Sequence, residues 1–374
     1  MTIFASSFQH HTHKEAKLST GTKWKTEEVN GVQLVWIRTP RYQSNNWRRV
    51  VNMVSYMVSS WRLGRHLPEF ESQVRRPDTV IGSSPHLLAV VSAWRLARYH
   101  KTQFIMEVRD LWPETLIDMG YLASRSPVTW LLRALESFLY RSADYIITVL
   151  PRAHEYIESR GIDSDKIAWI PNGVDLSRYA KPRATASPGA VFTVMYVGAH
   201  GEANGLGTLL NAAKAVQDRE GITTRFVLVG DGPEKPSLLK QAARLSLRNV
   251  AFYPPVPRIE VPKVLASADA TVLVLNDLPL YRYGISLNKL SDYLAAGKPI
   301  IFAGNSANNP VAEARCGLTV PPEDVGALAT AVIALSRTPL EERRMMGERG
   351  REYAEQHYAM SLLAEKFAQC IDID

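Results

Sequence analysis

Two patterns alternate along most of the 374 residues. Short apolar runs rich in β-branched residues, such as VFTVMYVG (191–198), are typical of buried strands, and stretches with apolar residues every three or four positions are typical of amphipathic helices. Their alternation predicts parallel sheets covered by helices, which is an α/β fold. The segment AKPRATASPGA (180–190) interrupts the alternation and predicts a linker, because it is rich in Pro, Ala and Ser.

The linker divides the chain into two domains, each of which we expect to be a Rossmann-like, doubly wound parallel sheet. A length of 374 residues exceeds what one hydrophobic core usually supports. We therefore predict an N-terminal domain over 1–179, a C-terminal domain over 191–357, and a C-terminal helix over 358–374, whose return to the first domain is left open. Two such sheets would face a central cleft, the usual place for a ligand.

The predicted elements follow one another in both halves of the chain. In the first half we expect strands at 1–8, 31–40, 78–85, 102–114, 143–150 and 166–175, and helices at 46–67, 86–99, 127–142 and 151–160. In the second half we expect strands at 191–198, 224–232, 249–254, 270–275 and 299–304, and helices at 205–217, 233–246, 258–267, 287–296, 323–337, 339–357 and 360–370. No run of 18 or more apolar residues occurs, so no membrane-spanning helix is expected.

The stretch YRYGISLNKLSDYLAAGKP (281–299) joins two predicted strands through a Gly-containing loop and a helix that we expect Ser286 to cap. Free amides and a partial positive charge at the start of a helix favour a diphosphate. Lys289 adds a full charge in the first turn, and Asp292 further along suits the diol of a ribose. An ordinary βαβ unit is the alternative, because no Gly-rich fingerprint is complete here.

The basic charge is concentrated in the first half of the chain. Residues 1–180 hold 23 Lys and Arg against 17 Asp and Glu, whereas the rest hold 21 against 20. Such an excess suits an anionic membrane surface, a phosphate-bearing acceptor or nucleic acid. Nucleic acid is not expected, because no helix-turn-helix, RNA-binding signature or zinc finger is present. Residues 41–65 are the candidate for docking on anionic lipid, and a helix packed on a sheet with solvated charges is the alternative.

The cysteines and histidines add little evidence for a metal. Cys316 and Cys370 provide no disulfide framework, which fits a reducing cytoplasm. His10, His11 and His13 lie in a predicted loop, where a zinc site, an acceptor-binding loop and a solvated loop all remain open. We expect no metal and no cofactor.

Six segments in this order resemble glycosyltransferase family 4 enzymes of the GT-B fold. They are VRDLWPE (108–114), IPNGVD (170–175), YVGAHGEANGLGTLLNAA (196–213), LVGDGPEKPSL (228–238), FYPPVPRIEVPKVLASADA (252–270) and YGISLNKLSDYLAAGKPII (283–301). The first and last segments look like those of the WbuB-like subgroup, which is associated with O-antigen and capsule assembly and with N-acetylated amino sugars. The resemblance implies that the C-terminal half binds a nucleotide sugar and the N-terminal half binds the acceptor.

The resemblance also implies a reaction. It is the transfer, with retention of anomeric configuration, of an N-acetylated amino sugar such as N-acetylfucosamine from a UDP-sugar to an undecaprenyl-diphosphate-linked saccharide. Such an enzyme would work on the inner face of the cytoplasmic membrane and without a metal, because helix N-termini and basic side chains hold the diphosphate. Two other functions stay open: a UDP-N-acetylglucosamine 2-epimerase, for which Asp110 and Glu114 are the few candidate acid/base groups, and a non-catalytic subunit that binds a nucleotide sugar.

The donor-binding residues follow from the matched motifs. They are Gly198, His200, Gly201, Gly230, Gly232, Tyr253, Val256, Gly284, Ile285, Ser286, Leu287, Asn288, Lys289 and Asp292. Asp292 matches the second, ribose-binding carboxylate of the family signature, but Gly284 stands at the first position, so that carboxylate is absent. The family's two phosphate-binding cations align with Ala199 and Asn204, and Lys289 is the expected substitute.

The catalytic candidates in the N-terminal half are Arg109 and Asp110, which follow a predicted strand where the family often has His-Asp. The resemblance implies that Asp110 orients the acceptor hydroxyl and that Arg109 binds phosphate or sugar oxygens. A structural pair beside the Trp112–Pro113 turn is the alternative.

The beginning of the sequence departs from the family pattern. The family's N-terminal domain opens with a strand, a Gly-rich loop and a helix before the strand that TIFASS (2–7) resembles. About 40 residues of those elements have no counterpart in this sequence. We therefore expect a mis-assigned start or a truncated, weakly active chain with an exposed sheet edge, unless Trp24, Trp36 and their neighbours repack over the gap.

Overall fold

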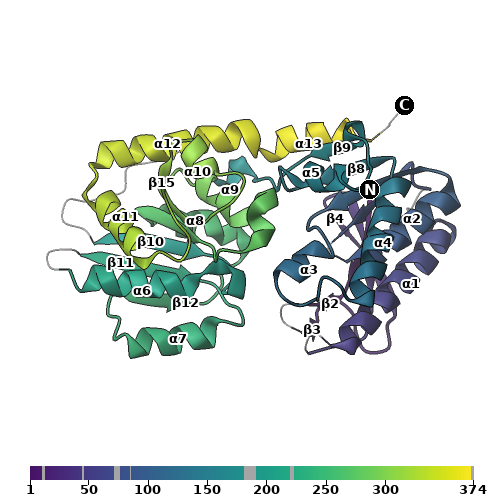
Figure 1. The fold of residues 1–374 in the computed structure, drawn as a ribbon. Coiled ribbons are helices and arrows are strands. Elements are labelled where there is room, and N and C mark those ends of the chain that lie inside the picture. Colours follow the sequence, from purple (N-terminus) through teal and green to yellow (C-terminus); the bar gives the residue numbers. More distant parts are fainter. Residues whose placement is uncertain are drawn as a thin grey trace. The chain divides into compact units, whose positions relative to one another are not determined.

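The structure is a computed structural model in which the chain forms two units (Figure 1). It describes residues 1–10, 13–43, 46–70, 76–84, 86–180, 191–219 and 223–371, without the side chains of 67–70. The first unit is Met1–Ile170 together with the chain end from Phe367, and the second is Pro171–Lys366. Most of the predicted linker, from 181 to 190, lies outside the described residues.

The units divide the chain at Ile170 rather than at the predicted 179. The residues just after Ile170 hydrogen-bond within the second unit: the Asn172 amide donates to Ser286 Oγ over 2.8 Å, and the Val174 amide donates to the Tyr358 carbonyl over 2.8 Å. At the other end of the chain, Gln103 Nε2 donates to the Cys370 carbonyl over 3.2 Å, which ties this terminus to the first unit.

The second unit is built on a six-stranded parallel sheet. Its strands are β10 (Phe192–Val197), β11 (Thr224–Val229), β12 (Val250–Tyr253), β13 (Ala270–Val274), β14 (Ile300–Ala303) and β15 (Gly317–Val320). Their order is β12-β11-β10-β13-β14-β15, and every pairing is parallel. The predicted Rossmann-like sheet is therefore confirmed here. The order reverses between β10 and β13, and ligands of such sheets bind at this switch point, beyond the carboxyl ends of the strands.

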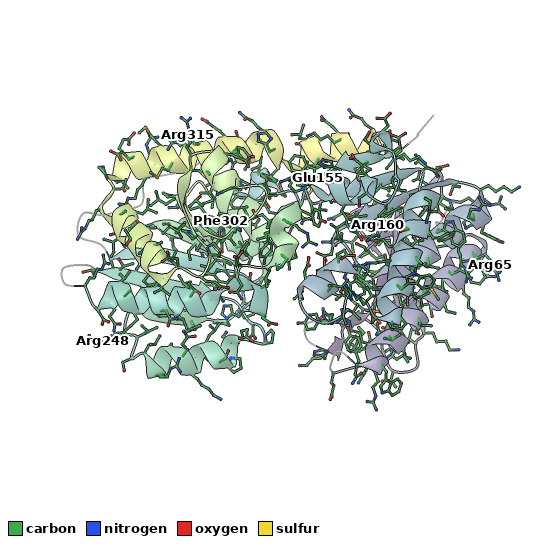
Figure 2. All side chains as sticks on the ribbon, in the orientation of Figure 1. Arg65, Glu155, Arg160, Arg248, Phe302 and Arg315 are labelled. Atoms are coloured by element: carbon green, nitrogen blue, oxygen red, sulfur yellow. The ribbon has the colours of Figure 1, made fainter. Side chains whose placement is uncertain are left out.

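Helices cover both faces of this sheet, which explains why its strands are mostly apolar. The helices in this part of the chain are α6 (Leu206–Gln217), α7 (Lys235–Arg244), α8 (Val261–Ala266), α9 (Asn288–Ala295), α10 (Pro310–Glu313), α11 (Val325–Arg337), α12 (Leu340–His357) and α13 (Met360–Ala368), the last of which ends in the first unit. One core lies between the sheet and α6 with α11, and a second lies between the sheet and α9. Phe302 of β14, in the middle of this unit in Figure 2, belongs to the second core.

The first unit has three sheets in its described part. Its strands are β1 (Thr2–Ser6), β2 (Phe8–Gln9), β3 (Lys14–Glu15), β4 (Trp24–Val29), β5 (Val32–Ile37), β6 (Thr79–Ser83), β7 (Gln103–Val108), β8 (Tyr145–Thr148) and β9 (Ile167–Trp169). Strands β6-β7-β8-β9 form a parallel sheet, β1-β5-β4 form a second sheet, and β2-β3 form a small third one.

The expectation that this half is parallel throughout is wrong for β4 and for the small β2-β3 sheet, which is antiparallel. β4 was not predicted, and it pairs antiparallel with β5 through a two-residue turn at Asn30 and Gly31. Both turn residues have positive φ, 52° and 76°. A tight hairpin turn of this kind requires positive φ at both positions, and Asn-Gly is its strongest sequence signal. The turn residues Asn30 and Gly31, and not the apolar pattern, therefore indicate this hairpin in the sequence.

Helices α1 (Trp47–Phe70), α2 (Leu87–His100) and α4 (Pro127–Ser142) form one layer of the first unit (Figure 1). α2 packs against both of the others. Ser60 of α1 and Ser92 of α2 share a hydrogen bond of 2.7 Å, and the rings of Trp94 and Phe138 join α2 to α4 at 4.9 Å. Two shorter helices, α3 (Glu114–Asp118) and α5 (Ala153–Glu158), complete the unit.

A buried carboxylate lies between α4 and α5. The Glu136 side chain is 0% exposed and accepts hydrogen bonds from the hydroxyls of Tyr140 (3.0 Å) and Tyr156 (2.7 Å). Burial raises the pKa of Glu136 to about 7, although both tyrosines and the charge of Arg160 oppose the rise. Ionised Glu136 is therefore less stable in the folded protein than in water.

This environment makes the stability of the first unit depend on pH. The pKa of Glu136 is about 7 in the folded protein, and the reference value is 4.5. Protonated Glu136 therefore makes its full contribution to folding stability below pH 4.5, and this contribution is lost as pH rises to 7. Glu136→Gln cannot titrate at this position. We therefore expect the gap between the unfolding free energies of wild type and this variant to change by up to about 1.4 kcal/mol per pH unit in this window. Urea unfolding of both proteins from pH 4.5 to 8 measures this difference, and parallel stability curves would contradict it.

Candidate active site

A pocket of about 580 Å³ lies at the switch point of the second unit. The carboxyl ends of β10 and β11, the segment after β12 and the first turns of α9 supply its walls. The lining residues are Val197, Gly198, Ala199, Val229, Gly230, Asp231, Pro255, Val256, Arg258, Val261, Ser286, Leu287, Asn288, Lys289, Asp292 and Tyr293. Eight of the predicted donor-binding residues are among them: Gly198, Gly230, Val256, Ser286, Leu287, Asn288, Lys289 and Asp292.

The start of α9 differs from the sequence prediction at its cap. Leu287 stands at the N-cap, with no side-chain hydrogen bond, and Ser286 lies one residue earlier. The Ser286 hydroxyl instead accepts from the Asn172 amide, and its carbonyl accepts from Asn172 Nδ2 over 2.6 Å. The expectation that Ser286 caps the helix is therefore wrong. With no side chain at the cap, the first amides of α9 remain available to an anion in the pocket.

Lys289 is the cation that lies closest to these amides along the chain. Its ammonium group donates to the Tyr196 hydroxyl over 2.8 Å and to Asn204 Oδ1, and it lies 4.8 Å from the centre of the Tyr196 ring. Asn204 in turn donates to the Ala199 carbonyl over 2.9 Å. Lys289 thus contacts position 204 directly and is connected to position 199 through Asn204, and these are the two positions where the family pattern expects cations. Loss of surrounding water lowers the pKa of Lys289 to about 7.

Asp292 lines the same pocket, and one of its oxygens is fixed. Asp292 Oδ1 accepts a 2.8 Å hydrogen bond from the Tyr179 hydroxyl, and Oδ2 takes no part in that bond. Burial raises the pKa of Asp292, whereas the bond from Tyr179 and the charges of Arg258 and Arg178 lower it. Tyr179 and Arg258 were absent from the sequence prediction. Tyr179 is separated from Asp292 by 113 positions, so no local signal joins the pair.

Tyr179 is expected to act by holding Asp292. Tyr179→Phe should raise the KM for the donor by about threefold to tenfold with little change in kcat, because one hydrogen bond to a carboxylate is lost. The pKa of Asp292 should also rise, so the acid limb of the kcat/KM profile should move to higher pH. Tyr353→Phe is a matched control, since Tyr353 donates to Glu313 over 2.5 Å elsewhere in this unit. An unchanged acid limb would mean that Tyr179 serves the fold alone.

Two predicted glycines shape the loop after β11. A Cβ at Gly230, where φ is 151°, would lie 1.9 Å from the Gly198 carbonyl oxygen, and one at Gly232, where φ is 158°, would lie 2.4 Å from that of His200. His200 itself is 0% exposed, and neither ring nitrogen has a hydrogen-bond partner among the described residues. Its amide donates to the Asp231 carbonyl over 2.8 Å. Neither His200 nor Gly232 is among the residues that line the pocket.

Four further predicted residues lie outside the lining. Gly284, with φ 96°, ends the 3₁₀ helix Pro279–Tyr283. Both backbone groups of Ile285 are taken by the Asn308 side chain, at 2.7 and 3.1 Å. The Tyr253 carbonyl accepts from the Gly230 amide over 3.2 Å, so its role is to hold the loop beside the pocket. Gly201 stands at the N-cap of the 3₁₀ helix Glu202–Asn204.

Comparisons with known proteins place this site in a family. The family model described as "Glycosyl transferase 4-like domain" matches residues 11–173, and the one described as "Glycosyl transferases group 1" matches residues 191–338. The chain belongs to the GT-B glycosyltransferases. Both halves of this glycosyltransferase are thus matched, and the pocket lies in the half that matches the group 1 description.

Curated relatives agree with this family. "Probable glycosyltransferase WbjE" of Pseudomonas aeruginosa is 26% identical over 314 residues, which are 80% of this chain and 76% of that protein. WcaI of Escherichia coli (strain K12), named for colanic acid biosynthesis, is 24% identical over 67% of this chain and 63% of its own length. The glycosyltransferase therefore resembles proteins named for polysaccharide assembly.

Solved structures share the fold. Sucrose-phosphate synthase from Thermosynechococcus elongatus has a TM-score of 0.74 at 18% identity, covering 98% of this chain and 87% of that one. Anabaena Alr3699/HepE in complex with UDP and glucose has a TM-score of 0.65 at 15% identity, covering 91% of this chain and 86% of that one. The two Rossmann-like domains expected from the sequence are therefore the architecture of this glycosyltransferase.

The two catalytic candidates lie in the first unit, directly after β7. The Arg109 amide donates to Ser84 Oγ over 2.9 Å, and the Asp110 carbonyl accepts from the Trp112 amide over 3.0 Å. Both side chains reach solvent, and no ion pair joins them in the part of the glycosyltransferase that the structure describes. Partial desolvation raises the pKa of Asp110, and the charge of Arg109 lowers it. Their position at the carboxyl end of a parallel strand is the one that ligands of such sheets use.

The structure describes two of the three histidines of the predicted loop, His10 and His13. Among the described residues, no group of three His, Cys, Asp or Glu side chains is placed to hold a metal ion, and His11 lies outside them. His10 shares a 2.6 Å hydrogen bond with the Tyr42 hydroxyl, and the rings of His10 and His13 are 6.1 Å apart.

None of the described helices is both long and apolar enough to cross a membrane.

Proposed function

We propose that this glycosyltransferase uses a UDP-activated, N-acetylated amino sugar, such as N-acetylfucosamine, as its donor. The observation that carries the proposal is the placing of Lys289 and Asp292 in one pocket at the start of α9. Free helix amides and a nearby ammonium suit a diphosphate, and a fixed carboxylate oxygen suits a ribose diol. The likeness in fold to HepE, solved with UDP and glucose, supports UDP as the nucleotide.

The acceptor in this proposal is an undecaprenyl-diphosphate-linked saccharide, and the product is an O-antigen or capsule polysaccharide. The name of WcaI supports polysaccharide assembly, and the motifs EVRDLWPE (107–114) and YGISLNKLSDYLAAGKPII (283–301) support the WbuB-like subgroup. A lipid-linked acceptor requires the enzyme to work at the inner face of the cytoplasmic membrane. α1 supports this location, because it covers most of 41–65 and exposes Trp47, Val50 and Val54.

The proposed chemistry needs no metal. The amides of α9 and the Lys289 ammonium neutralise the diphosphate as its bond to the sugar breaks. The acceptor hydroxyl attacks the anomeric carbon from the face that UDP leaves, and the departing diphosphate oxygen takes its proton, so the configuration is retained. In this scheme Asp110 orients the hydroxyl, and Arg109 binds oxygens of the donor sugar or a phosphate.

A panel of UDP-sugars tests the donor. Saturation-transfer NMR with UDP-N-acetylglucosamine, UDP-N-acetylgalactosamine, UDP-N-acetylfucosamine and UDP-glucose should show contacts to uracil and ribose for all, and the strongest signal from one N-acetylated sugar. Addition of the lipid-diphosphate-linked acceptor should then release UDP from that donor. Absence of any UDP-dependent signal would refute the proposed nucleotide.

The epimerase alternative requires an acid and a base around the sugar ring, and Glu114 is unsuited to that task. Burial raises the pKa of Glu114, but bonds from Arg133 at 2.7 Å and Arg160 at 3.3 Å outweigh burial and lower it. Incubation with UDP-N-acetylglucosamine alone separates the two enzymes, since only an epimerase converts it without an acceptor. A non-catalytic subunit would bind the donor and release no UDP in either assay.

A further inference from the structure

α4 exposes the apolar side that a soluble helix normally buries. Its outer stripe contains Trp130, which is 73% exposed, Leu131, which is 61% exposed, and Phe138. The opposite side, with Thr129 and Glu136, is buried and faces the rest of the unit. A contiguous exposed apolar stripe of this kind marks an interaction site, because isolated apolar residues on a surface are normal but grouped ones are not.

α1 repeats this arrangement on the other side of α2. Its inner side packs on the β1-β5-β4 sheet, where the Tyr56 hydroxyl donates to the Phe4 carbonyl over 2.9 Å and Leu63 contacts the core. Its outer side exposes Trp47, which is 69% exposed, together with Val51 and Val54. Both helices therefore turn apolar residues away from the sheets that they cover.

α2 lies between these two stripes and supplies charge. Arg95 and Arg98 are exposed on it, and the Arg95 guanidinium lies 5.7 Å from the centre of the Trp61 ring on α1. Arg65 of α1 lies over the same ring at 4.7 Å and points outward at the edge of the unit in Figure 2. The outer surface of the three helices thus alternates apolar stripes with arginines.

The charge of this surface has one sign. Helices α1 (to His66), α2 and α4 hold eight arginines, of which Arg133 is paired with Glu114. Their single acidic residue, Glu136, is 0% exposed. A second copy of the chain would bring the same arginines against them, and the like charges would repel. An anionic bilayer matches both features, since its headgroups attract arginines and its interface accepts tryptophan and aliphatic side chains.

We propose that the outer faces of α1, α2 and α4 form one docking surface for an anionic lipid bilayer, and that Trp130 and Leu131 insert into the interface. The sequence pattern pointed to 41–65 alone. The proposal extends the membrane location suggested for the proposed function, but it does not depend on which donor or acceptor is used.

Vesicle co-sedimentation tests the surface with the whole chain. Wild type should bind vesicles of phosphatidylglycerol and phosphatidylethanolamine, bind phosphatidylcholine vesicles weakly, and lose affinity as salt rises. The double variant Trp130→Glu, Leu131→Glu should lower the partition coefficient by about tenfold or more, because two inserted side chains become charged. Leu239→Glu is the matched control: Leu239 is 46% exposed on α7 in the second unit, and this variant should bind as wild type does.

The proposal would be overturned if wild type did not bind anionic vesicles, or if the double variant bound them as wild type does. It would also be overturned if sedimentation velocity showed a wild-type dimer that the double variant does not form. Trp130→Ala, which adds no charge, should give a smaller loss in the same direction. The circular dichroism and UDP affinity of each variant in the absence of vesicles should be unchanged. Failure of the donor proposal would instead appear as absent UDP binding in every variant, wild type included.

Discussion

Lys289→Ala weakens UDP binding by about tenfold or more and uridine binding much less, since a charge-assisted contact to the diphosphate is lost. The structure gives the reason: the Lys289 ammonium stands beside the free amides of α9 and reaches Asn204, where the family pattern expects a cation. Lys289→Met, which keeps most of the side-chain stem, should show the same selectivity. Isothermal titration with UDP and with uridine measures both losses.

The pKa of Lys289 adds a pH dependence to this result. Because burial lowers it to about 7, the free protein loses the positive charge as pH rises above 7. The second ionisation of a phosphate ester has a pKa of about 6, so UDP changes its charge little above pH 7. Its affinity for wild type should therefore fall from pH 7 to 9, by up to about tenfold per pH unit. Binding of the diphosphate favours the charged form of Lys289, so the protein should take up protons when UDP binds.

The controls separate a binding role from a structural one. Lys240→Ala removes an exposed lysine of α7 and should change neither affinity nor pH dependence. In Lys289→Met the fall in UDP affinity above pH 7 should disappear. Equal losses for UDP and uridine in both Lys289 variants would mean that the lysine stabilises the pocket and does not contact phosphate.

Asp292→Asn should raise the donor KM by about tenfold or more with a smaller effect on kcat, because the carboxylate is proposed to hold the ribose and not the reacting atoms. The Tyr179 hydroxyl fixes Oδ1 of this carboxylate, and an asparagine offers one acceptor where two are needed. Initial rates over a range of donor concentrations measure the change. Asp218→Asn, at the C-cap of α6, is the control and should leave the donor KM unaltered.

The two variants at this pair should not be additive. If Tyr179 works through Asp292, then Tyr179→Phe in the Asp292→Asn background should cause little further rise in KM. Additive effects would show that each residue acts on its own. A donor KM that does not change in Asp292→Asn would remove Asp292 from the proposed site.

The sequence determined most elements of the second unit, although it missed β15 and α10, and it determined the strand ends that build the pocket. Apolar runs that are buried on both faces, and glycines that permit the turns after β10 and β11, are local signals, so VFTVMYVG (191–198) and VGDGPE (229–234) could be placed without tertiary contacts. The same reasoning gave helix 127–142 with its observed bounds. It missed β4, because an Asn-Gly turn carried the signal there and the apolar pattern did not.

Only the tertiary structure decided the surroundings of the side chains. Ser286 could be read as a helix cap, but Asn172, 114 positions away, takes its hydroxyl. Tyr179 and Asp292 meet across a similar distance in sequence, and the lowered pKa of Lys289 depends on what encloses it. For α4, the spacing of apolar residues predicted a helix but did not predict that Trp130 faces outward. Periodicity determines which residues share a side of the helix, whereas packing against neighbouring elements determines which side is covered.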